Sequence, residues 1–407
     1  MRCGLLGRTL GHSYSPLIHS YLGDYSYELF EKEPEDLEGF LKTGDFHGLN
    51  VTIPYKQAVI PYLDELSPAA RRLGAVNTIV RREDGSLVGH NTDFFGFQAM
   101  VTRSGLSLSG KKALVLGSGG ASKPAIAALE DLGARVINVS RSGENNYENL
   151  DLHRDAALIV NATPVGMYPK TGVSPLSLEG FPQLEGVLDL IYNPARTRLL
   201  LDAEKRGLRT QNGLWMLVSQ AWESAQWFLG QPIPEDKIQL IHSRIRSSVE
   251  NLILIGMPGS GKSTVGQLLA QKLNREFRDA DQVLEQQFGP IPEIFRTQGE
   301  AGFRKLETQV LTELSRHSGL VIATGGGCVT RPENYDLLHQ NGRIFCLSRP
   351  LDQLSREGRP LSQDLGVEAL YEARKDLYAQ FADQTVQNTG SPQDTARQIL
   401  TLWEEMK

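Results

Sequence analysis

The stretch Asn251-Leu-Ile-Leu-Ile-Gly-Met-Pro-Gly-Ser-Gly-Lys-Ser-Thr264 decides the fold of the C-terminal part of the chain. Its aliphatic beginning predicts a buried strand, and the residues after it predict a helix from about Lys262 to Leu273. Between them, the sequence matches the GxxxxGK[ST] pattern of a phosphate-binding loop in full. Glycine lets such a loop wrap a phosphate chain with inward-facing N–H groups, and the helix N-terminus adds positive partial charge. The alternative, a glycine-rich turn with a chance lysine, is disfavoured because both flanks are correct.

A strand that runs into a glycine loop occurs a second time, earlier in the chain. Ala113–Gly117 is a short aliphatic run that ends in glycine, Ala121–Leu132 predicts a helix of small residues, and Ala134–Val139 predicts another strand. This is a βαβ unit whose loop Gly117-Ser-Gly-Gly-Ala-Ser122 follows the dinucleotide-binding pattern GxGxx(G), with serine at the third glycine position. The two units together predict an α/β protein with a Rossmann domain and a phosphate-loop domain.

Length and composition exclude several classes of protein. The chain has 407 residues, so two or three domains are expected. With 40% hydrophobic and 22% charged residues it resembles globular proteins rather than disordered chains, collagens or coiled coils. The net charge of −6 lacks the basic footprint of a nucleic-acid binder. Glycine is frequent, with 40 residues, and falls at the ends of predicted strands, where the backbone turns tightly or approaches a ligand.

The cysteines and the absence of long apolar runs bear on location. Cys3, Cys328 and Cys346 show no CxxC spacing, so neither a disulfide framework nor a zinc site is expected, and a reduced cytoplasmic setting fits. The first residues contain no long apolar run and predict no secretory signal. No stretch of about eighteen apolar residues predicts a membrane span.

Charged and glycine residues beyond the phosphate loop are candidates for its chemistry. Lys262 is expected to neutralise the β- and γ-phosphates, and Ser263 to bind magnesium. Asp279 and Asp281 end the next predicted strand, where residues two apart share a face and can point at one site. The alternative is a pair of surface acids.

The phosphate loop itself is shared by GTPases, motors and small-molecule kinases. Arg304 and the three glycines Gly325–Gly327, which follow the apolar strand Leu320–Ala323, add an anion-binding group and a close backbone approach. These features favour a small-molecule kinase.

From Asn251 to the C-terminus the chain resembles shikimate kinase. The matching elements, in order, are the phosphate loop, the Asp-x-Asp pair, Gly302-Phe-Arg304, the triple glycine, Arg359-Pro-Leu361, and Arg374 with Leu377-Tyr378. The lid region around Leu354–Leu361 is short beside typical members.

The resemblance implies a role for each matching residue. Asp279 would coordinate magnesium through water, and Asp281 would hold the shikimate ring hydroxyls and orient or deprotonate the attacking one. Arg304 and Arg374 would clamp the shikimate carboxylate, which suits a guanidinium fork. The substrate would be lined by Gly325, Gly326 and Gly327. The residues expected to hold ATP are Gly259, Ser260, Gly261, Lys262, Ser263, Thr264, Arg356 and Arg359.

The first 240 residues contain a dense set of polar motifs. These motifs are Gly11-His-Ser13-Tyr-Ser15-Pro16, Asn50-Val-Thr52-Ile-Pro-Tyr-Lys56, Gly74-Ala-Val-Asn77-Thr78, Gly89-His-Asn91-Thr92-Asp93, Asn161–Met167, Asp189–Pro194 and Asn212–Gln220. The second of these motifs is expected to end a strand in a lysine, Lys56. Taken alone, any one of the motifs is an ordinary turn with solvated polar groups. Together they resemble shikimate dehydrogenase over roughly residues 1–240.

This second resemblance implies a substrate site and a catalytic pair. Ser13 and Ser15 would bind the substrate carboxylate, and Lys56 and Asp93 would form the catalytic pair, with the lysine ammonium stabilising charge on the ketone oxygen. The residues expected to contact the rest of the substrate are Thr52, Asn77, Asn91, Tyr192 and Gln220. The residues expected to bind the dinucleotide are Gly117, Ser118, Gly119, Gly120, Ala121, Ser140, Arg141, Ser142, Ala162, Gly213 and Met216.

The end of the second Rossmann strand favours NADP over NAD. An NAD site usually has an acidic residue there, which binds the ribose hydroxyls. This chain has Asn138-Val-Ser-Arg141-Ser142 instead, and Arg141 can bind a 2′-phosphate. The second arginine of many NADP-using relatives is replaced by the stretch Gly143–Asn146.

Trp215 stands where the family usually has a small residue. It either narrows the nicotinamide pocket or points into the core.

The whole chain is therefore expected to be a bifunctional enzyme of aromatic amino-acid biosynthesis. It would reduce 3-dehydroshikimate to shikimate with NADPH and then phosphorylate shikimate at the 3-hydroxyl with ATP and Mg²⁺. The alternatives are that one half has become a regulatory or binding module, or that the dehydrogenase uses quinate. No nucleic-acid or membrane partner is expected, and both a monomer and a homodimer remain open.

The expected domain division follows from the motifs. A substrate-binding domain at 1–100 is completed by helices at about 213–240, the Rossmann domain spans 101–212, and the kinase domain spans 247–407. Between them, the prolines of Gly230–Lys237 predict a turn, and return helices and linker occupy 213–246. The junction itself is expected within 243–250.

Overall fold

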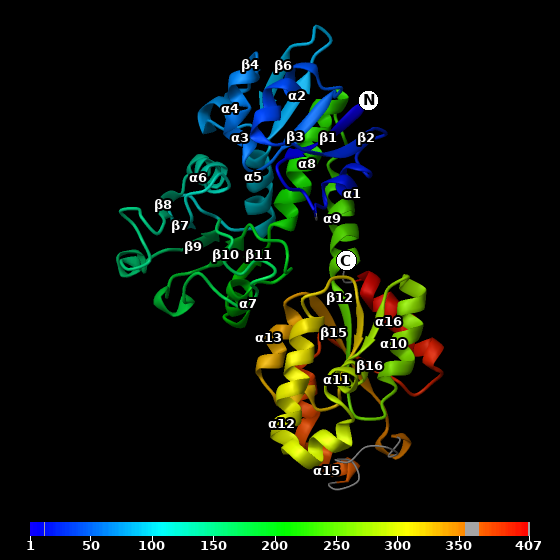
Figure 1. The fold of residues 1–407 in the computed structure, drawn as a ribbon. Coiled ribbons are helices and arrows are strands. Elements are labelled where there is room, and N and C mark those ends of the chain that lie inside the picture. The colour runs from blue at the N-terminus through cyan, green and yellow to red at the C-terminus, as the bar shows by residue number, and fades with distance from the viewer. Residues whose placement is uncertain (12, 355–365, 406–407) are drawn as a thin grey trace. The chain divides into compact units, whose positions relative to one another are not determined.

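The computed structural model describes residues 1–11, 13–354 and 366–405 (Figure 1). Its packing divides the chain into two compact units. The first unit comprises Met1–Val165, Ser174–Tyr192 and Asp202–Ile245, and the second comprises Gly166–Val173, Asn193–Leu201 and Arg246–Lys407. The described strands form three separate sheets, two of them in the first unit.

The N-terminal sheet of the first unit is mixed. Its order is β2 (Ser26–Glu31), β1 (Arg2–Gly7), β3 (Gly48–Val51), β5 (Thr78–Arg81), β6 (Leu87–His90) and β4 (Glu65–Leu66). Strands β2, β1 and β3 run parallel, whereas β5 pairs antiparallel with both β3 and β6. The associated helices are α1 (Ser15–His19), α2 (Leu37–Thr43), α3 (Tyr55–Ala58), α4 (Pro68–Leu73), α5 (Asp93–Ser104), α8 (Leu214–Leu229) and α9 (Asp236–Val249).

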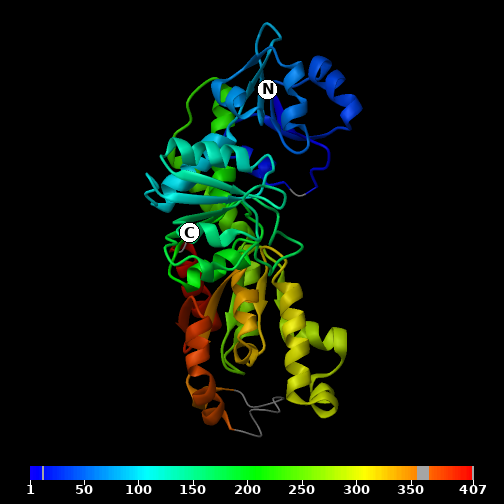
Figure 2. The ribbon, with the colours of Figure 1, turned by 90° about the vertical axis from the view of Figure 1, so that its left-hand side faces the viewer.

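The second sheet of the first unit is fully parallel. Its order is β11 (Arg209–Gln211), β10 (Gly186–Asp189), β9 (Leu158–Asn161), β7 (Lys112–Leu116) and β8 (Arg135–Val139), with α6 (Ser122–Asp131) between β7 and β8 and α7 (Arg198–Lys205) before β11. The predicted βαβ unit is thus confirmed to within a residue or two at each boundary. The same sheet is seen from a second direction in Figure 2.

The sheet of the second unit is parallel and covered on both faces. Its order is β13 (Phe277–Asp279), β14 (Val321–Ala323), β12 (Asn251–Ile255), β15 (Gly342–Ser348) and β16 (Gln384–Gln387). Its helices are α10 (Lys262–Leu273), α11 (Ala280–Phe288), α12 (Ile291–Leu314), α13 (Glu333–His339), α15 (Val367–Phe381) and α16 (Pro392–Glu405). Helices α11, α12 and α13 lie on one face, and α10 and α16 on the other (Figure 1).

Strand β12 shows why this sheet is buried. Leu252 and Leu254 pack into the core beneath α10 and α16, whereas Ile253 and Ile255 pack into the core beneath α11 and α12. Successive side chains of a strand point to opposite faces, so a strand covered by helices on both sides must be apolar throughout. The α/β fold with Rossmann-like parallel sheets and a phosphate-loop domain is therefore confirmed.

Two local predictions differ from the structure. The carboxylates Asp279 and Asp281 do not share a strand face, because β13 ends at Asp279 and Asp281 lies in the first turn of α11. The Asp279 carboxylate caps that helix by accepting from the backbone N–H groups of Asp281 and Gln282, which ends the strand. Lys56 lies in the short helix α3 rather than at a strand end. The boundary between the two compact units, between Ile245 and Arg246, falls within the segment 243–250 expected as the junction, and α9 continues through it to Val249. Among the described helices, none is long and apolar enough to span a membrane.

A buried ion pair ties the start of β15 to the residue that precedes β12. Arg343 Nε lies 2.6 Å from Glu250 Oε2, in an ion pair whose geometry is not that of a hydrogen bond, and the two side chains are 1% and 3% exposed. Arg246 Nε lies 2.8 Å from the other carboxylate oxygen of Glu250. Burial of a guanidinium is tolerated only while a counter-charge compensates it.

We expect Glu250→Ala to destabilise the second unit by about 3–5 kcal/mol, because it leaves the Arg343 guanidinium buried without its carboxylate. The measurement is the free energy of unfolding in urea. Glu276→Ala, which removes an exposed partner of Arg278, is the matched control, and a change within about 1 kcal/mol is expected for it. Equal losses in the two variants would contradict this account.

Candidate active sites

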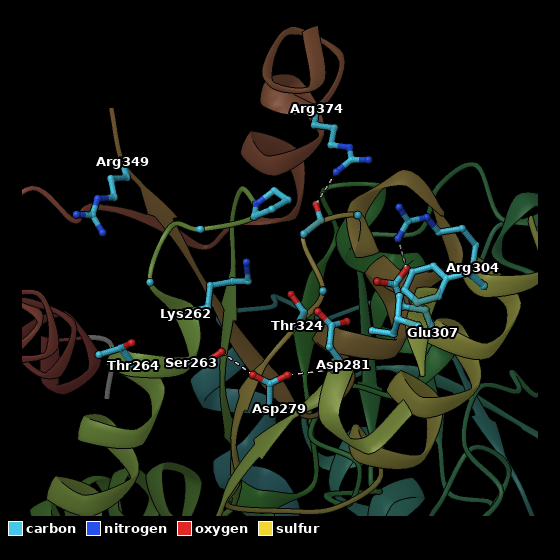
Figure 3. A pocket seen from close by; sticks show the side chains of 18 of the residues that line it. Lys262, Ser263, Thr264, Asp279, Asp281, Arg304, Glu307, Thr324, Arg349 and Arg374 are labelled. Carbon is cyan, nitrogen blue, oxygen red and sulfur yellow. Dashed lines mark hydrogen bonds and ion pairs between the residues drawn. The ribbon is translucent and has the colours of Figure 1, made fainter. Parts of the chain in front are cut away.

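The second unit contains a cavity of about 450 Å³ at the carboxyl edge of its sheet (Figure 3). Strands β12, β13, β14 and β15 all end there, as expected for ligand sites of parallel sheets. The described lining residues are Pro258, Gly259, Gly261, Lys262, Ser263, Thr264, Asp279, Asp281, Ile291, Phe295, Phe303, Arg304, Glu307, Thr324, Gly325, Gly326, Gly327, Arg349 and Arg374. The predicted loop, acids, arginines and glycines are thus brought together. Ser260 is buried in the same loop, and Arg356 and Arg359 lie outside the described residues.

The phosphate loop has the backbone shape that its glycines predict. Gly256 and Gly261 have φ of 139° and 95°, values that side-chain-bearing residues rarely adopt. Lys262 is buried, and its ammonium donates to the carbonyls of Gly256 and Met257 at 3.0 and 3.1 Å. The loop and the lysine therefore form a cationic cradle that fits a nucleotide phosphate chain.

Ser263 and Asp279 form the oxygen pair expected for a magnesium ion. The Ser263 hydroxyl donates to Asp279 Oδ2 at 2.5 Å, and both residues line the cavity beside Lys262. Magnesium is usually bound by one or two protein oxygens together with substrate phosphates and water. The residues present therefore fit this ion.

The opposite side of the cavity holds a buried cluster of two acids and an arginine. Arg304 Nη1 pairs with Glu307 Oε2 at 2.7 Å, and the two residues are 7% and 1% exposed. Burial, followed by the nearby charges of Glu307 and Asp279, raises the pKa of Asp281 to about 6 against the opposing effect of Lys262 and Arg304. A carboxyl group with this pKa can both accept and release a proton near neutral pH.

The three successive glycines lie in close contact with their surroundings, two of them against this cluster and Gly326 against Pro258. A Cβ at Gly325 would overlap the carboxylates of Glu307 and Asp281, and a Cβ at Gly327 would overlap the Arg304 guanidinium. Their role here is close approach, because the backbone of these residues is not in the left-handed region. The functional side chains therefore lie directly against the backbone after β14.

Arg374 completes this side of the cavity from α15. Its Nη1 donates to the Gly326 carbonyl at 3.3 Å, and the Tyr378 hydroxyl donates to the same carbonyl. Arg304 and Arg374 enter the cavity from two helices on the same side, away from the phosphate loop (Figure 3). Two guanidinium groups and an acid so placed suit a small hydroxy acid.

A second cavity, of about 230 Å³, lies in the first unit. Its lining combines residues of the N-terminal sheet, the Rossmann loop and α8. The described lining residues are Leu5, Ser13, Ser15, Asn50, Val51, Thr52, Lys56, Asn77, Asp93, Ala121, Leu190, Tyr192, Gly213, Met216, Leu217 and Gln220. Nearly all predicted substrate contacts therefore meet predicted cofactor residues in one place.

Lys56 and Asp93 form an ion pair in this cavity. Lys56 Nζ lies 2.6 Å from Asp93 Oδ2, and both side chains are largely buried. Asp93 is the first residue of α5, and Lys56 lies in α3. Two elements distant in sequence thus hold a proton-carrying ammonium against its carboxylate.

A buried hydrogen-bond network positions the amides behind this pair. Asn77 Oδ1 accepts from the Thr92 backbone N–H at 2.7 Å, and Asn77 Nδ2 donates to the Thr92 hydroxyl at 3.0 Å. Asn91, by contrast, is not among the described residues that line the cavity. Its Nδ2 donates to the Ala75 carbonyl at 2.9 Å, and its Oδ1 accepts from the backbone of Phe94. The structure therefore gives Asn91 a part in shaping the turn before α5.

Most of the predicted dinucleotide residues follow the ends of three adjacent strands, whereas Gly213 and Met216 lie at the start of α8. Gly117–Ala121 follow β7, Ser140–Ser142 follow β8, and Ala162 follows β9. Gly117 has φ of 112°, and a Cβ there would crowd the Ala162 carbonyl. Parallel strands bring these ends to one edge, and Arg141 is exposed there, so the residues fit an NADP molecule.

Ser122, at the third glycine position, has a local role in the same loop. Its hydroxyl donates to the Gly119 carbonyl at 2.7 Å.

Trp215 is not among the described lining residues of the cavity and packs instead between α5 and α9. The Arg103 guanidinium lies 3.9 Å from its ring centroid, and His242 packs edge-on at 5.1 Å. Trp215 thus points away from the substrate cavity.

Sequence reasoning missed four polar residues that line the cavities. Glu307, Thr324 and Arg349 lie in the second unit, and Asn50 lies in the first. A signal for Glu307 existed, because it stands three residues after Arg304 on a helix and therefore lies beside it. Asn50 belongs to the motif Asn50–Lys56, but the sequence does not show which polar side chain of a buried strand faces the cavity.

Comparison with known proteins gives two family matches. Residues 258–404 match the model of shikimate kinase, and residues 5–79 match the model of the shikimate dehydrogenase substrate binding domain. A curated shikimate dehydrogenase (NADP(+)) of Syntrophomonas wolfei is 37% identical over 283 residues, which cover 61% of this chain and 96% of that protein.

Two solved structures are similar to the same part of the chain. The chorismate mutase/shikimate 5-dehydrogenase fusion protein from Clostridium acetobutylicum aligns with a TM-score of 0.57 and 37% identity, covering 60% of this chain and 96% of that one. Shikimate 5-dehydrogenase from Thermus thermophilus, in complex with NADP(H) and shikimate, aligns with a TM-score of 0.54 and 34% identity, covering 60% and 99%.

We expect Asp281→Asn to stabilise the protein at neutral pH. The folded-state pKa of about 6 lies above the ordinary value of 3.8, so the folded protein binds the extra proton between these values and loses stability as pH rises through them. Asparagine removes this penalty, which amounts to up to about 3 kcal/mol above pH 6. The measurement is the difference in Tm between variant and wild type at several pH values.

The difference is expected to be positive at pH 7.5 and to shrink towards pH 4. A difference that does not change with pH, or a variant less stable at pH 7.5, would contradict the assigned burial of this charge.

Proposed function

The chain belongs to the shikimate dehydrogenase family, carries a shikimate kinase domain and is a bifunctional enzyme of the shikimate pathway, and we propose that its two cavities catalyse consecutive steps. In the first cavity 3-dehydroshikimate is reduced to shikimate, and in the second shikimate is phosphorylated at its 3-hydroxyl. The observation that carries this proposal is the lining of the two cavities. Each holds an acid–base group beside a nucleotide-binding loop.

NADPH supplies the hydride of the first step, and ATP with magnesium supplies the phosphoryl group of the second. In the first cavity, Ser13 and Ser15 hold the substrate carboxylate, and Thr52, Asn77 and Gln220 hold the ring hydroxyls, with Tyr192 beside them. These contacts fix the ketone relative to Lys56.

Lys56 is the proton donor of the reduction. Its ammonium stabilises the negative charge that develops on the ketone oxygen and gives its proton to that oxygen. Asp93, 2.6 Å away, keeps the ammonium oriented. Arg141, with Ser140 and Ser142 beside it, holds the 2′-phosphate that distinguishes NADP from NAD.

In the second cavity, Asp281 accepts the proton of the shikimate 3-hydroxyl. With a pKa of about 6, it is mainly ionised at neutral pH and is ready to do so. Arg304 and Arg374 hold the carboxylate, and the backbone of Gly325–Gly327 lines the ring. Lys262 neutralises the phosphates, while Ser263 and Asp279 hold the metal ion, so catalysis here is positioning and charge neutralisation.

We also propose a cytoplasmic location for the protein and a function for each of its domains. Cys3, Cys328 and Cys346 are free, buried thiols, which suits the reducing cytoplasm. We further propose that the substrate-binding domain occupies residues 1–100 with helices at about 213–240, the Rossmann domain 101–212 and the kinase domain 247–407.

Reciprocal lysine variants test the assignment of the two activities. Lys56→Ala is expected to lower NADPH-dependent reduction by at least about 100-fold and to leave phosphorylation of shikimate unchanged. Lys262→Ala is expected to do the converse, because its ammonium belongs to the phosphate loop. The measurements are separate steady-state assays of the two reactions on each variant.

Lys111→Ala and Lys375→Ala, which remove exposed lysines paired with Glu185 and Glu372, are the matched controls and are expected to leave both activities unchanged. Loss of both activities in a folded Lys56→Ala or Lys262→Ala variant would refute the independent sites. A wild-type protein that binds its ligands but turns over at only one cavity would favour a regulatory module.

A further inference from the structure

Arg349 is a cavity residue to which neither reaction has yet given a role. It is the first residue after β15, and it lines the cavity of the second unit together with Lys262 and Thr264. Strand β15 pairs with β12 up to Ile255, the last residue before the phosphate loop. Arg349 therefore stands at the end of the strand that lies directly beside that loop.

The backbone that carries Arg349 is fixed on both sides. The Ser348 carbonyl accepts from the backbone N–H of Asn388 at 2.7 Å, which extends the pairing of β15 with β16 to the last residue of the strand. Pro350 follows, and a residue before proline is restricted to extended conformations. Little backbone entropy is therefore lost when Arg349 binds a ligand.

The guanidinium of Arg349 has an unmet hydrogen-bonding need. Its Nε is buried and has no hydrogen-bond partner among the residues that the structure describes. A buried donor without a partner is unfavourable and rare in folded proteins. The planar fork of a guanidinium matches the oxygens of a phosphate group.

The place of Arg349 in the cavity decides which anion it meets. Figure 3 shows Arg349 on the side of the cavity that carries Lys262 and Thr264, with Arg304 and Arg374 on the other side. Arg304 lies against Gly327 and Arg374 donates to the Gly326 carbonyl, so both guanidinium groups border the glycine run, where the small acid is proposed to be held. The side of Arg349 is that of the nucleotide.

Building on the nucleotide site assigned above, we propose that Arg349 binds the phosphate chain of ATP. It supplies a second cation beside Lys262, on a backbone anchored by β16. Through this contact it positions the nucleotide without touching the hydroxy acid.

Calorimetric titration with ADP in the presence of Mg²⁺ tests this role without turnover. Arg349→Ala in the full chain is expected to raise the Kd for ADP by about 10-fold to 100-fold, the effect of losing a charge-assisted hydrogen bond. Arg349→Lys keeps the charge and loses the fork, so an intermediate Kd is expected. The KM for ATP is expected to follow the Kd, while the KM for shikimate and the dehydrogenase activity remain at wild-type values.

Arg397→Ala, which removes an exposed arginine from α16 of the same unit, is the matched control and is expected to bind ADP normally. An ADP affinity of Arg349→Ala within twofold of wild type would overturn the inference, as would a rise in the KM for shikimate alone. If Arg349→Ala does not fold, Arg349→Lys decides by the same criterion. Failure of the wild-type chain to bind ADP would instead refute the proposed kinase site itself.

Discussion

Parallel pairing of strands is the constraint on which the nucleotide-binding half of each site depends. In both five-stranded sheets every strand runs in one direction, so all carboxyl ends meet at one edge. The loops that leave this edge bring together residues far apart in sequence, such as Lys262, Asp279 and Gly325. The apolar strands give the edge a rigid support, which is what a site that works by positioning needs. Sites on such an edge tolerate different chemistry because only the loops change.

Buried charge is the second theme of the molecule. Asp281 and Glu307 belong to a buried charged cluster, and burial raises the pKa of each, with Arg304 opposing the rise for both. Such a cluster is unfavourable for folding and useful for proton transfer, a combination typical of active sites. In the first unit the same logic takes another form, because Lys56 and Asp93 neutralise each other at 2.6 Å. One site thus tunes a single acid, whereas the other keeps a charged pair.

The sequence predicted best what depends on local pattern and least what depends on tertiary packing. The helix Lys262–Leu273 and the strand beginning at Asn251 follow from periodicity and the glycine loop, and both have the expected bounds almost to the residue. The sequence placed Asp281 on a strand, whereas it lies in the first turn of α11. The pattern of residues cannot show that Asp279 caps this helix and so ends the strand before Asp281. The substrate contact expected of Asn91 is an inference from likeness and stays a prediction, whereas the bonds of its amide to nearby backbone gave no signal in the sequence. Arg349 gave no local signal, since only the pairing of β15 with β12 brings it beside the phosphate loop.

The central claim is that one chain carries two consecutive reactions, with shikimate as the product of one cavity and the substrate of the other. The most direct measurement supplies the purified chain with 3-dehydroshikimate, NADPH, ATP and Mg²⁺ and follows formation of the phosphate ester. The account predicts that shikimate 3-phosphate forms only when both NADPH and ATP are present, and that shikimate accumulates when ATP is left out. No ester in the complete mixture, or ester formed without NADPH, would contradict it.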